Sequence, residues 1–185
     1  AHPEAQVAEQ AKWLEYTRDE AGQMKGLVED LLFLAKADAA RHGSAPTLVS
    51  LSELALGCLL PFESVAFEAG VTLEHQIAPD LTLMGDEGQL RRLIRILLDN
   101  AVKYAGPGGT ATLTLERRQD KLRLIVCNTG QPIPPEHLPH LFERFYRADT
   151  ARDRQGGGYG LGLSIAKGIV EGHRGKISGT SAPGA

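Results

Sequence analysis

The stretch that decides the fold is Gly-Gly-Gly-Tyr-Gly-Leu-Gly-Leu-Ser-Ile-Ala at residues 156–166. Five glycines stand at the start of an apolar run that has the pattern of a helix. Glycine has no Cβ, so it permits positive φ angles and lets the backbone approach a bulky ligand closely. A helix N-terminus presents unpaired N–H groups and the positive end of the helix dipole, which suit phosphate. The stretch alone indicates a phosphate-binding loop, although glycine-rich hinges and turns have a similar composition.

Three further segments precede the glycines: LLDNAVKY at 97–104, NTGQPI at 128–133 and LFERFYR at 141–147. In this order the four segments resemble the N, G1, F and G2 boxes of the catalytic domain of sensor histidine kinases. That domain belongs to a larger ATPase group with type II topoisomerases, Hsp90-like chaperones and MutL-like repair proteins. The resemblance covers residues 47–181, and four boxes in one order are far more specific than any one of them.

Apolar periodicity around these segments predicts helices and strands. Ser50 and Asp86 each precede an apolar helical pattern and are expected to be N-caps, with Glu53 and Gln89 three residues further on. Helices beside antiparallel strands predict an α/β fold of the two-layer α/β sandwich type, which is also the histidine kinase-type ATP-binding fold that the resemblance implies. The expected strands are 47–49, 71–77, 81–84, a hairpin of 110–117 and 121–127, and one beginning at 175; the expected helices are 50–68, 86–104, a short one beginning at 134, and 161–171.

Residues 3–41 are predicted to form one long bundle-forming helix that precedes the sandwich. The resemblance implies that residues 1–41 are part of a dimerisation domain, its second hairpin helix. Residues 42–47 are then a linker, and residues 48–185 are the ATP-binding catalytic domain with its last strand truncated. We expect the apolar stripe of the helix to drive self-association, as in a homodimer. The stripe recurs at steps of three and four residues: Val7, Ala11, Leu14, Met24, Val28, Leu31 and Ala35.

Composition limits the function classes. The chain has 185 residues, of which 42% are hydrophobic and 23% charged, and a net charge of −3. This charge gives no reason to expect nucleic-acid binding, which requires a concentrated basic face. No apolar run approaches the ~20 residues of a membrane span. Cys58 and Cys127 are expected to be buried free thiols in a reducing cytoplasm. We expect a cytoplasmic location, as the cytoplasmic part of a membrane-bound sensor, although membrane anchoring of a parent protein stays open.

Asn100 and Lys103 are the candidate catalytic residues. They lie three residues apart on one predicted helix, so both side chains are able to face one ligand. Asn100 offers a carbonyl oxygen to Mg²⁺ and an amide to phosphate, so it is also the candidate metal ligand. Lys103 offers a point charge to phosphate. Tyr104 is expected to line the nucleotide pocket.

The remaining candidate cofactor-binding residues follow from the resemblance. Asn128 stands where the family usually has an Asp that binds the adenine amino group, and its amide oxygen is still able to accept that hydrogen bond. Gly130 and Ile133 belong to the same box, whose usual second glycine is absent here. Arg147, with Arg144 nearby, is expected to hold phosphate oxygens. Residues 149–158 are expected to form a lid, and the glycine-rich box contributes Gly158, Tyr159, Gly160, Leu161, Gly162 and Leu163.

Two departures from the family restrict the chemistry. Ile96, one turn before Asn100, occupies a position that is Asn in many histidine kinases and Glu in the chaperone and topoisomerase relatives. Isoleucine neither binds Mg²⁺ nor activates water, which argues against a water-hydrolysing ATPase. The phosphoacceptor histidine box is also missing, and His2 does not match it. Asp99 is a doubtful catalytic residue because the next position on a helix lies ~100° away.

The resemblance therefore implies the catalytic domain of a two-component sensor histidine kinase. Such a domain uses ATP and Mg²⁺ to phosphorylate a histidine on its own dimerisation domain, for relay to an aspartate of a response regulator. This fragment is expected to bind ATP or ADP but to be unable to autophosphorylate. The alternatives are a nucleotide-binding regulatory module with little kinase activity, an anti-sigma-type serine kinase, and a chaperone- or repair-type ATPase.

Overall fold

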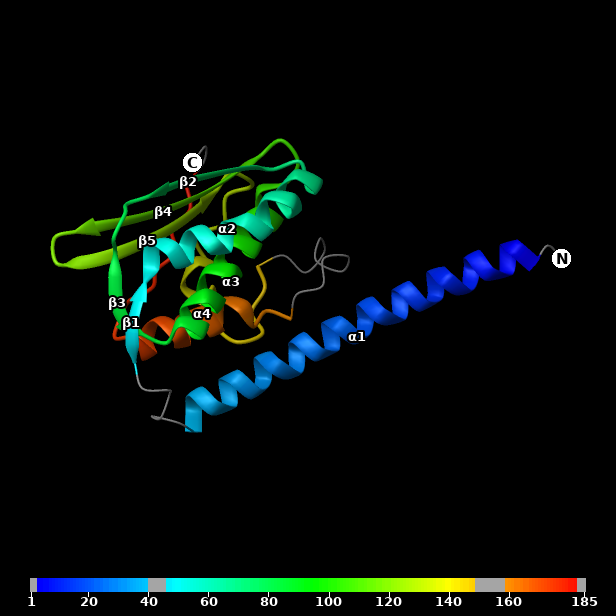
Figure 1. Ribbon diagram of the computed structural model, residues 1–185, viewed down its shortest axis with the longest axis horizontal. Helices are drawn as coiled ribbons and strands as arrows, with labels where there is room; N and C mark the ends of the chain where they lie inside the picture. The colour runs from blue at the N-terminus through cyan, green and yellow to red at the C-terminus, as the bar shows by residue number, and fades with distance from the viewer. Residues whose placement is uncertain (1–2, 40–45, 149–158, 183–185) are drawn as a thin grey trace.

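The computed structural model describes residues 3–39, 46–148 and 159–182. Figure 1 shows a sheet in one layer and helices in a second layer, with one long helix outside them. The expected two-layer α/β sandwich is confirmed. The elements are α1 (Pro3–Ala39), β1 (Thr47–Ser50), α2 (Leu51–Glu68), β2 (Thr72–Ile77), β3 (Thr82–Gly85), α3 (Glu87–Ala105), β4 (Thr110–Arg118), β5 (Lys121–Asn128), the 3₁₀ turn η1 (Leu138–His140) and α4 (Gly162–Gly172).

The main sheet has the strand order β2-β4-β5, and β1 pairs with β3 in a separate two-stranded sheet. The predicted hairpin is confirmed, since β4 and β5 pair antiparallel with Arg118 opposite Lys121. The expectation of antiparallel strands is wrong for β2, which pairs parallel to β4 with Thr72 opposite Thr110. The chain passes through β3 and α3 between these two strands, and such a crossover returns it in the same direction.

Both predicted helix caps are present. The Ser50 side chain accepts a hydrogen bond from the Glu53 backbone N–H at 3.4 Å. The Asp86 carboxylate accepts one from the Gln89 N–H at 2.9 Å, so each cap satisfies a donor that the first helical turn leaves unpaired. Gly70 ends α2 with a φ of +66°, a conformation that suits glycine.

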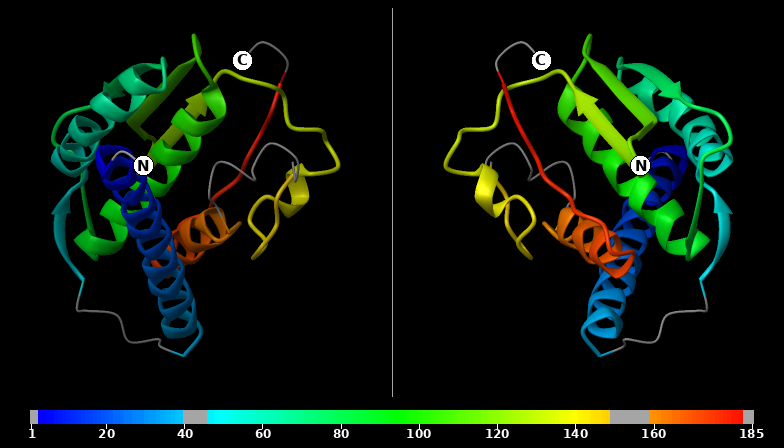
Figure 2. Two further views of the ribbon diagram at one scale, coloured as in Figure 1. Left: turned by 90° about the vertical axis from the view of Figure 1, so that its right-hand side faces the viewer. Right: turned by 90° about the vertical axis from the view of Figure 1, so that its left-hand side faces the viewer.

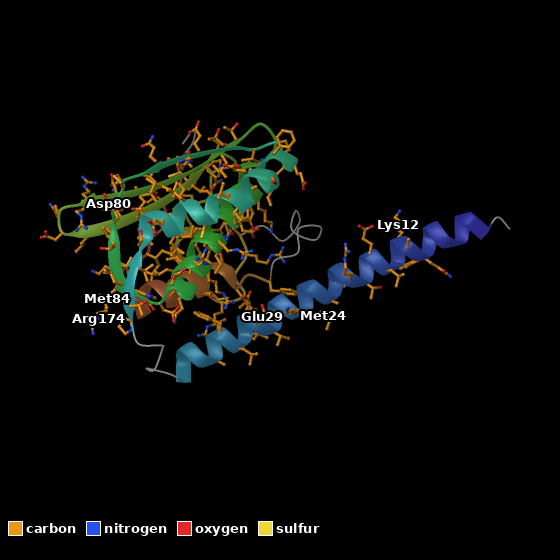
Figure 3. All side chains as sticks on the ribbon, in the orientation of Figure 1. Lys12, Met24, Glu29, Asp80, Met84 and Arg174 are labelled. Atoms are coloured by element: carbon orange, nitrogen blue, oxygen red, sulfur yellow. The ribbon has the colours of Figure 1, made fainter. Side chains whose placement is uncertain are left out.

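The main core lies between the β2-β4-β5 sheet and helices α2 and α3. Leu113 and Leu115 of β4 face inward, while Ile94 and Leu98 of α3 are fully buried beneath them. Side chains fill this interior, whereas Met24 on α1 lies outside the sandwich (Figure 3). A second, smaller group of buried residues, here called the α4 cluster, consists of Leu34, Leu93, Leu161, Ile165, Ala166 and Ile169.

The long N-terminal helix is confirmed as α1, Pro3–Ala39. Its C-terminal part runs beside α4, and its N-terminal part extends away from the sandwich (Figures 1 and 2). In the described residues, no helix combines the length and the apolar composition that a membrane span requires. The assignment of 1–41, 42–47 and 48–185 to a dimerisation domain, a linker and a catalytic domain stays a prediction.

Two expected elements differ from the structure in the described segments. The short helix expected from Pro134 is reduced to the 3₁₀ turn Leu138–His140, because Pro139 supplies no N–H to continue a helix. The strand expected from Gly175 is wrong, since residues 175–182 have no strand assignment. Side chains hold that segment instead: Ile177 packs against the α4 cluster, and the Ser181 hydroxyl accepts a hydrogen bond from the Ile133 N–H at 2.8 Å.

Candidate nucleotide site

Gly130 brings the segment after β5 onto the C-terminal end of α3. Its φ is +144°, in the region that favours glycine. A Cβ at this position would lie 2.4 Å from the carbonyl oxygen of Tyr104 and 3.6 Å from the side-chain nitrogen of Asn128. Only a residue without a side chain fits this approach, so the glycine joins the segments 128–133 and 97–104.

Gly160 makes the equivalent approach to the segment 141–147. Its φ is +71°, and a Cβ would lie 2.8 Å from the carbonyl carbon of Phe145 and 2.9 Å from the carbonyl oxygen of Tyr146. The Phe145 N–H also donates a hydrogen bond to the Gly160 carbonyl at 3.0 Å. Phe145 itself has a φ of +63°, an unusual conformation for a bulky residue that indicates a tightly determined turn.

Gly162 places the start of α4 beside α3. A Cβ here would lie 3.4 Å from Cγ2 of Ile96 and 3.8 Å from the side-chain nitrogen of Asn100. The glycines at 130, 160 and 162 thus bring together all four segments that the sequence singled out. They lie around the C-terminal half of α3.

Asn100 and Lys103 project from that half of α3. The Asn100 amide nitrogen donates to the carbonyl of Ile96 at 2.8 Å, which fixes the half-buried side chain and leaves its carbonyl oxygen as the group suited to a cation. The Lys103 ammonium lies 5.1 Å from the centroid of the Tyr104 ring, a cation–π distance, and Tyr104 is 50% exposed. These side chains form a polar surface where the expected phosphate and metal ligands are adjacent.

Asn128 is exposed at the end of β5. Its amide nitrogen donates to the carbonyl of Thr129 at 2.8 Å. The Thr129 hydroxyl in turn accepts from the Thr110 N–H at 2.8 Å, which anchors this turn to the start of β4. The Ile133 N–H is bonded to Ser181, so the segment is held at both ends.

The start of α4 has the features of an anion-binding helix end. Unlike α2 and α3, this helix has no side-chain cap hydrogen bond at its N-cap, Leu161. Leu161 is only 1% exposed, so its side chain belongs to the α4 cluster and only its backbone is placed to meet a ligand. Leu163 is half-buried and Tyr159 is exposed. Gly158 and the expected lid at 149–158 lie outside the described residues.

Arg147 is half-buried and Arg144 is exposed in the segment before the glycines. A neighbouring contact was not predicted: the His137 Nδ1 lies 2.5 Å from the Tyr146 hydroxyl. The signal available in the sequence was weak, because a histidine nine residues from a tyrosine in a proline-rich turn has no recognisable spacing. The contact stabilises the turn that carries Arg147.

Asp99, the neighbour of Asn100 in the chain, carries a carboxyl group whose pKa is shifted. Desolvation raises the pKa of the Asp99 carboxyl, and the positive charges of Lys103 and Arg95 oppose that rise. The Ile96 side chain is half-buried and packs against the α4 cluster. Within the described ranges, no three His, Cys, Asp or Glu side chains form a metal-binding group.

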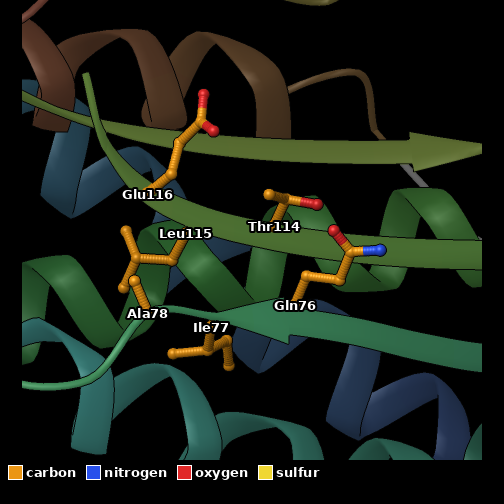
Figure 4. A pocket seen from close by; sticks show the side chains of 6 residues that line it. All are labelled: Gln76, Ile77, Ala78, Thr114, Leu115 and Glu116. Carbon is orange, nitrogen blue, oxygen red and sulfur yellow. The ribbon is translucent and has the colours of Figure 1, made fainter.

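A shallow hollow on the sheet lies elsewhere (Figure 4). It is lined by the end of β2 and the middle of β4: Gln76, Ile77, Ala78, Thr114, Leu115 and Glu116. Asn128 lies at the start of β4, where it pairs with Ala111. The hollow is therefore separate from the four segments.

Comparison with known proteins agrees with this geometry. Residues 85–185 match the family described as histidine kinase-, DNA gyrase B- and HSP90-like ATPases, and the chain belongs to that family. Within it, sequence and fold are those of the catalytic ATP-binding domain of sensor histidine kinases.

Among its relatives, the chain is 38% identical to the sensor histidine kinase CusS of Escherichia coli O157:H7, over 88% of the chain and 34% of that protein. It is 40% identical to the sensor histidine kinase YkoH of Bacillus subtilis, over 92% of the chain and 37% of that protein. The chain thus spans about a third of the length of these curated relatives. Because the relatives are sensor kinases, the alternatives of a regulatory module or a serine kinase are not favoured.

Solved structures give the same result. Full-length ShkA in complex with AMPPNP superposes with a TM-score of 0.77 at 26% identity, covering 94% of this chain and 37% of that one. The catalytic domain of histidine kinase ThkA superposes with a TM-score of 0.60 at 29% identity, covering 69% of this chain and 81% of that one.

Proposed function

We propose that the chain binds ATP with Mg²⁺ between the C-terminal half of α3 and the start of α4. The observation that carries this proposal is that three glycines gather the four segments: Gly130 and Gly160 lie too close to the neighbouring backbone for a Cβ, and Gly162 lies in ordinary contact with α3. The start of α4, where no side chain caps the helix, supports it, because the N–H groups of a first helical turn and the helix dipole favour phosphate. The AMPPNP complex of ShkA, a similar protein, supports a nucleotide as the ligand.

Each candidate residue has a role in this proposal. The Asn100 carbonyl oxygen binds Mg²⁺, while phosphates and water supply its other ligands, as Mg²⁺ tolerates. Lys103 and Arg147 bind phosphate oxygens. Asn128 accepts from the base, and Tyr104 lines the pocket beside Gly130 and Ile133. Magnesium neutralises phosphate charge when it is bound. The protein's own contribution to phosphoryl transfer is to position the phosphates and to stabilise their charge. The remaining phosphate contacts come from the glycine-rich segment: Gly158, Tyr159, Gly160, Leu161, Gly162 and Leu163.

A thermal melt with Mg-ADP tests the site. A ligand that binds only the folded state stabilises it by about 2.7 kcal/mol at a hundredfold excess over Kd. We expect the wild-type melting temperature to rise, and Asn100→Asp to abolish the rise because a carboxylate then faces the phosphates. Gln76→Glu adds the same charge at the far hollow and is the matched control. A wild-type melt that millimolar Mg-ADP leaves unmoved would contradict the proposal.

We propose that the site serves a histidine kinase reaction in a longer protein. The γ-phosphate passes to a histidine of the dimerisation domain and then to an aspartate of a response regulator. A similar protein, ThkA, has been crystallised with its response regulator TrrA, although this likeness at 22% identity concerns the fold alone. The chain alone should stay unlabelled by γ-labelled ATP. A longer form with the dimerisation hairpin should become labelled, and its Asn100→Asp variant should not.

A homodimer on the cytoplasmic side of a membrane sensor is part of the same proposal. Leu14, Met24 and Val28 of α1 are each more than half exposed, so the predicted stripe is present as an unburied seam. Sedimentation should detect self-association that Val28→Glu weakens. Leu60→Glu, at an exposed leucine of α2, is the control and should leave it unchanged. A monomer at high concentration would remove this part of the proposal.

A further inference from the structure

The end of α4 lies against the start of α3, at the far end of this helix pair from the candidate site. Gly162, at the start of α4, lies beside Ile96 and Asn100 in the second half of α3. His173, the C-cap of α4, contacts Asp86, the N-cap of α3. The two helices are therefore antiparallel neighbours (Figure 1), and a contact at one end helps to fix where the other end lies.

Both ring nitrogens of His173 have backbone partners. Nε2 lies 3.1 Å from the backbone nitrogen of Asp86, and Nδ1 lies 2.7 Å from the carbonyl oxygen of Ile169. The Asp86 N–H only donates, so Nε2 accepts, and the Ile169 carbonyl only accepts, so Nδ1 carries the proton. His173 is therefore a neutral imidazole in its Nδ1–H tautomer, because no other protonation state satisfies both partners. The bond from the Asp86 N–H to Nε2 is here called the α3–α4 link.

The imidazole also occupies the space that a side chain at position 85 would need. A Cβ on Gly85, the last residue of β3, would lie 2.8 Å from Cδ2 and 2.9 Å from Nε2 of His173. The chain turns sharply after the imidazole: Arg174 has a φ of +58°, and the Gly175 N–H donates to the Val170 carbonyl at 2.8 Å. The ring thus fills the corner between β3, α3 and α4 from a well-determined backbone.

The α3–α4 link differs in kind from the packing between the two helices. The α4 cluster consists of apolar side chains, and apolar burial has no preferred direction. Helices packed in this way slide past one another by about 1–2 Å in many switching proteins. A hydrogen bond, in contrast, is directional, so the bond from Asp86 to His173 fixes α4 along the axis of α3. A shift of α4 would move its first turn, residues 161–163, relative to Asn100.

We propose that His173 is a positioning residue of the nucleotide site, because the α3–α4 link fixes the start of α4 beside Asn100. This proposal rests on the proposed nucleotide-binding function. The imidazole stands roughly 15 Å along α4 from Gly162, since each helical residue adds ~1.5 Å, so it acts through the backbone of α4 and not on the phosphates. Loss of the link leaves α4 folded, but its first turn no longer holds one position, and the affinity for Mg-ADP falls.

Two substitutions separate the α3–α4 link from the bond within α4. In His173→Gln the amide oxygen reaches the position of Nε2, so the acceptor for the Asp86 N–H is kept. In His173→Asn the shorter amide reaches only the position of Nδ1, so the bond to the Ile169 carbonyl is kept and the link is lost. Gly85→Ala displaces the unaltered imidazole from the side of β3, and it is a second way to break the link.

Two controls are matched to these variants. His75→Asn makes the same change at an exposed histidine of β2. Ser50→Ala removes the side-chain cap of α2, so it also removes one hydrogen bond at a helix end, but neither α3 nor α4 is involved. A residue that supports stability alone changes the melting temperature and leaves the Kd of Mg-ADP unchanged, which is the result that we expect for Ser50→Ala.

Three measurements are made on the full chain. The ¹⁵N shifts of the His173 ring in the wild type show which nitrogen carries the proton. Hydrogen exchange of the Asp86 amide, measured in every variant without nucleotide, shows whether its N–H is bonded. Calorimetry gives the Kd of Mg-ADP for every variant, at one temperature below all of their melting transitions. The first two measurements do not depend on nucleotide binding.

We expect a protonated Nδ1 and an unprotonated Nε2 in the wild type. The Asp86 amide should exchange slowly in the wild type, in both controls and in His173→Gln, and faster in His173→Asn and Gly85→Ala. The Kd of Mg-ADP should rise about fivefold in the two variants that break the link, and it should stay within about twofold of the wild-type value in His173→Gln and in both controls.

A protonated Nε2, or an Asp86 amide that still exchanges slowly in His173→Asn, overturns the link. Faster exchange without a change in Kd overturns the positioning role. A similar rise in Kd in Ser50→Ala also overturns that role, because affinity would then follow general stability. A wild type that binds no Mg-ADP defeats the proposed function and the positioning role with it, while the ring shifts and the amide exchange still decide the link.

Discussion

The main core and the α4 cluster differ in how they are assembled. The main core joins α2, α3 and the sheet, which follow one another closely along the chain. The α4 cluster draws Leu34, Leu93 and Ile165 from three helices that are far apart in sequence. The first supports the fold, whereas the second supports the segment that carries Gly160 and Gly162.

We expect this difference to separate the stability of the sandwich from nucleotide binding at the candidate site. A change in the main core should lower the stability of the whole sandwich. A change near the α4 cluster should alter the candidate site while the sheet and its two long helices remain folded, because stability is not uniform across a structure. The variants below test that separation, beginning with the largest expected effect.

Leu98→Ala should produce the largest loss of stability. Leu98 has no exposed surface in the main core, and removing such a side chain leaves a cavity that costs about 2–5 kcal/mol. Urea unfolding measures the loss. Leu60→Ala, at a leucine that is 67% exposed on α2, is the control and should change the free energy of unfolding far less. Equal losses in the two variants would mean that the main core is misassigned.

Gly160→Ala should abolish nucleotide binding with a smaller loss of stability. A side chain at positive φ costs about 1–2 kcal/mol, and this one also displaces the backbone of Phe145. Gly168→Ala on α4 is the control, since nothing lies within 4 Å of its Cβ. Calorimetry with Mg-ADP should detect binding to the control only. Wild-type affinity in Gly160→Ala would show that the approach of the two segments is unnecessary.

The smallest effect concerns the two cysteines. Burial raises the pKa of the Cys58 thiol above its ordinary value of 9.0, while Arg91 and Arg95 oppose the rise. The unfolded chain then loses this proton first, so the contribution of Cys58 to stability is complete below pH 9.0 and is lost as the pH rises through the folded pKa. The expected burial is wrong for Cys127, which is exposed at the end of β5. Cys127 should therefore react with a thiol reagent in the native protein, whereas Cys58 should react only on unfolding. Equal reaction rates would contradict the buried position of Cys58.

Local signals explain why much of the fold could be predicted. The caps at Ser50 and Asp86 and the alternation of β4 and β5 depend on neighbours within a few residues. The parallel pairing of β2 with β4 could not be predicted from such signals, because alternation does not identify a partner strand. The burial of Leu34 was missed for a similar reason, since its face of α1 overlaps the exposed stripe in sequence.

The candidate site was predicted unevenly. The resemblance identified Asn100, Gly130 and Gly160, and the close approaches now give those glycines a physical reason. The inward direction of Leu161 could not be predicted, because it depends on α3 and α1 arriving from distant parts of the chain. The binding roles of all these residues stay predictions.

Backbone amide shifts on addition of Mg-ADP test the central claim most directly, because they locate the ligand residue by residue. The account predicts the largest shifts at Asn100, Gly130 and residues 160–163, with almost none at the hollow near Gln76. Shifts concentrated at that hollow, or no shifts at millimolar Mg-ADP, would contradict the claim that the four segments form a nucleotide site.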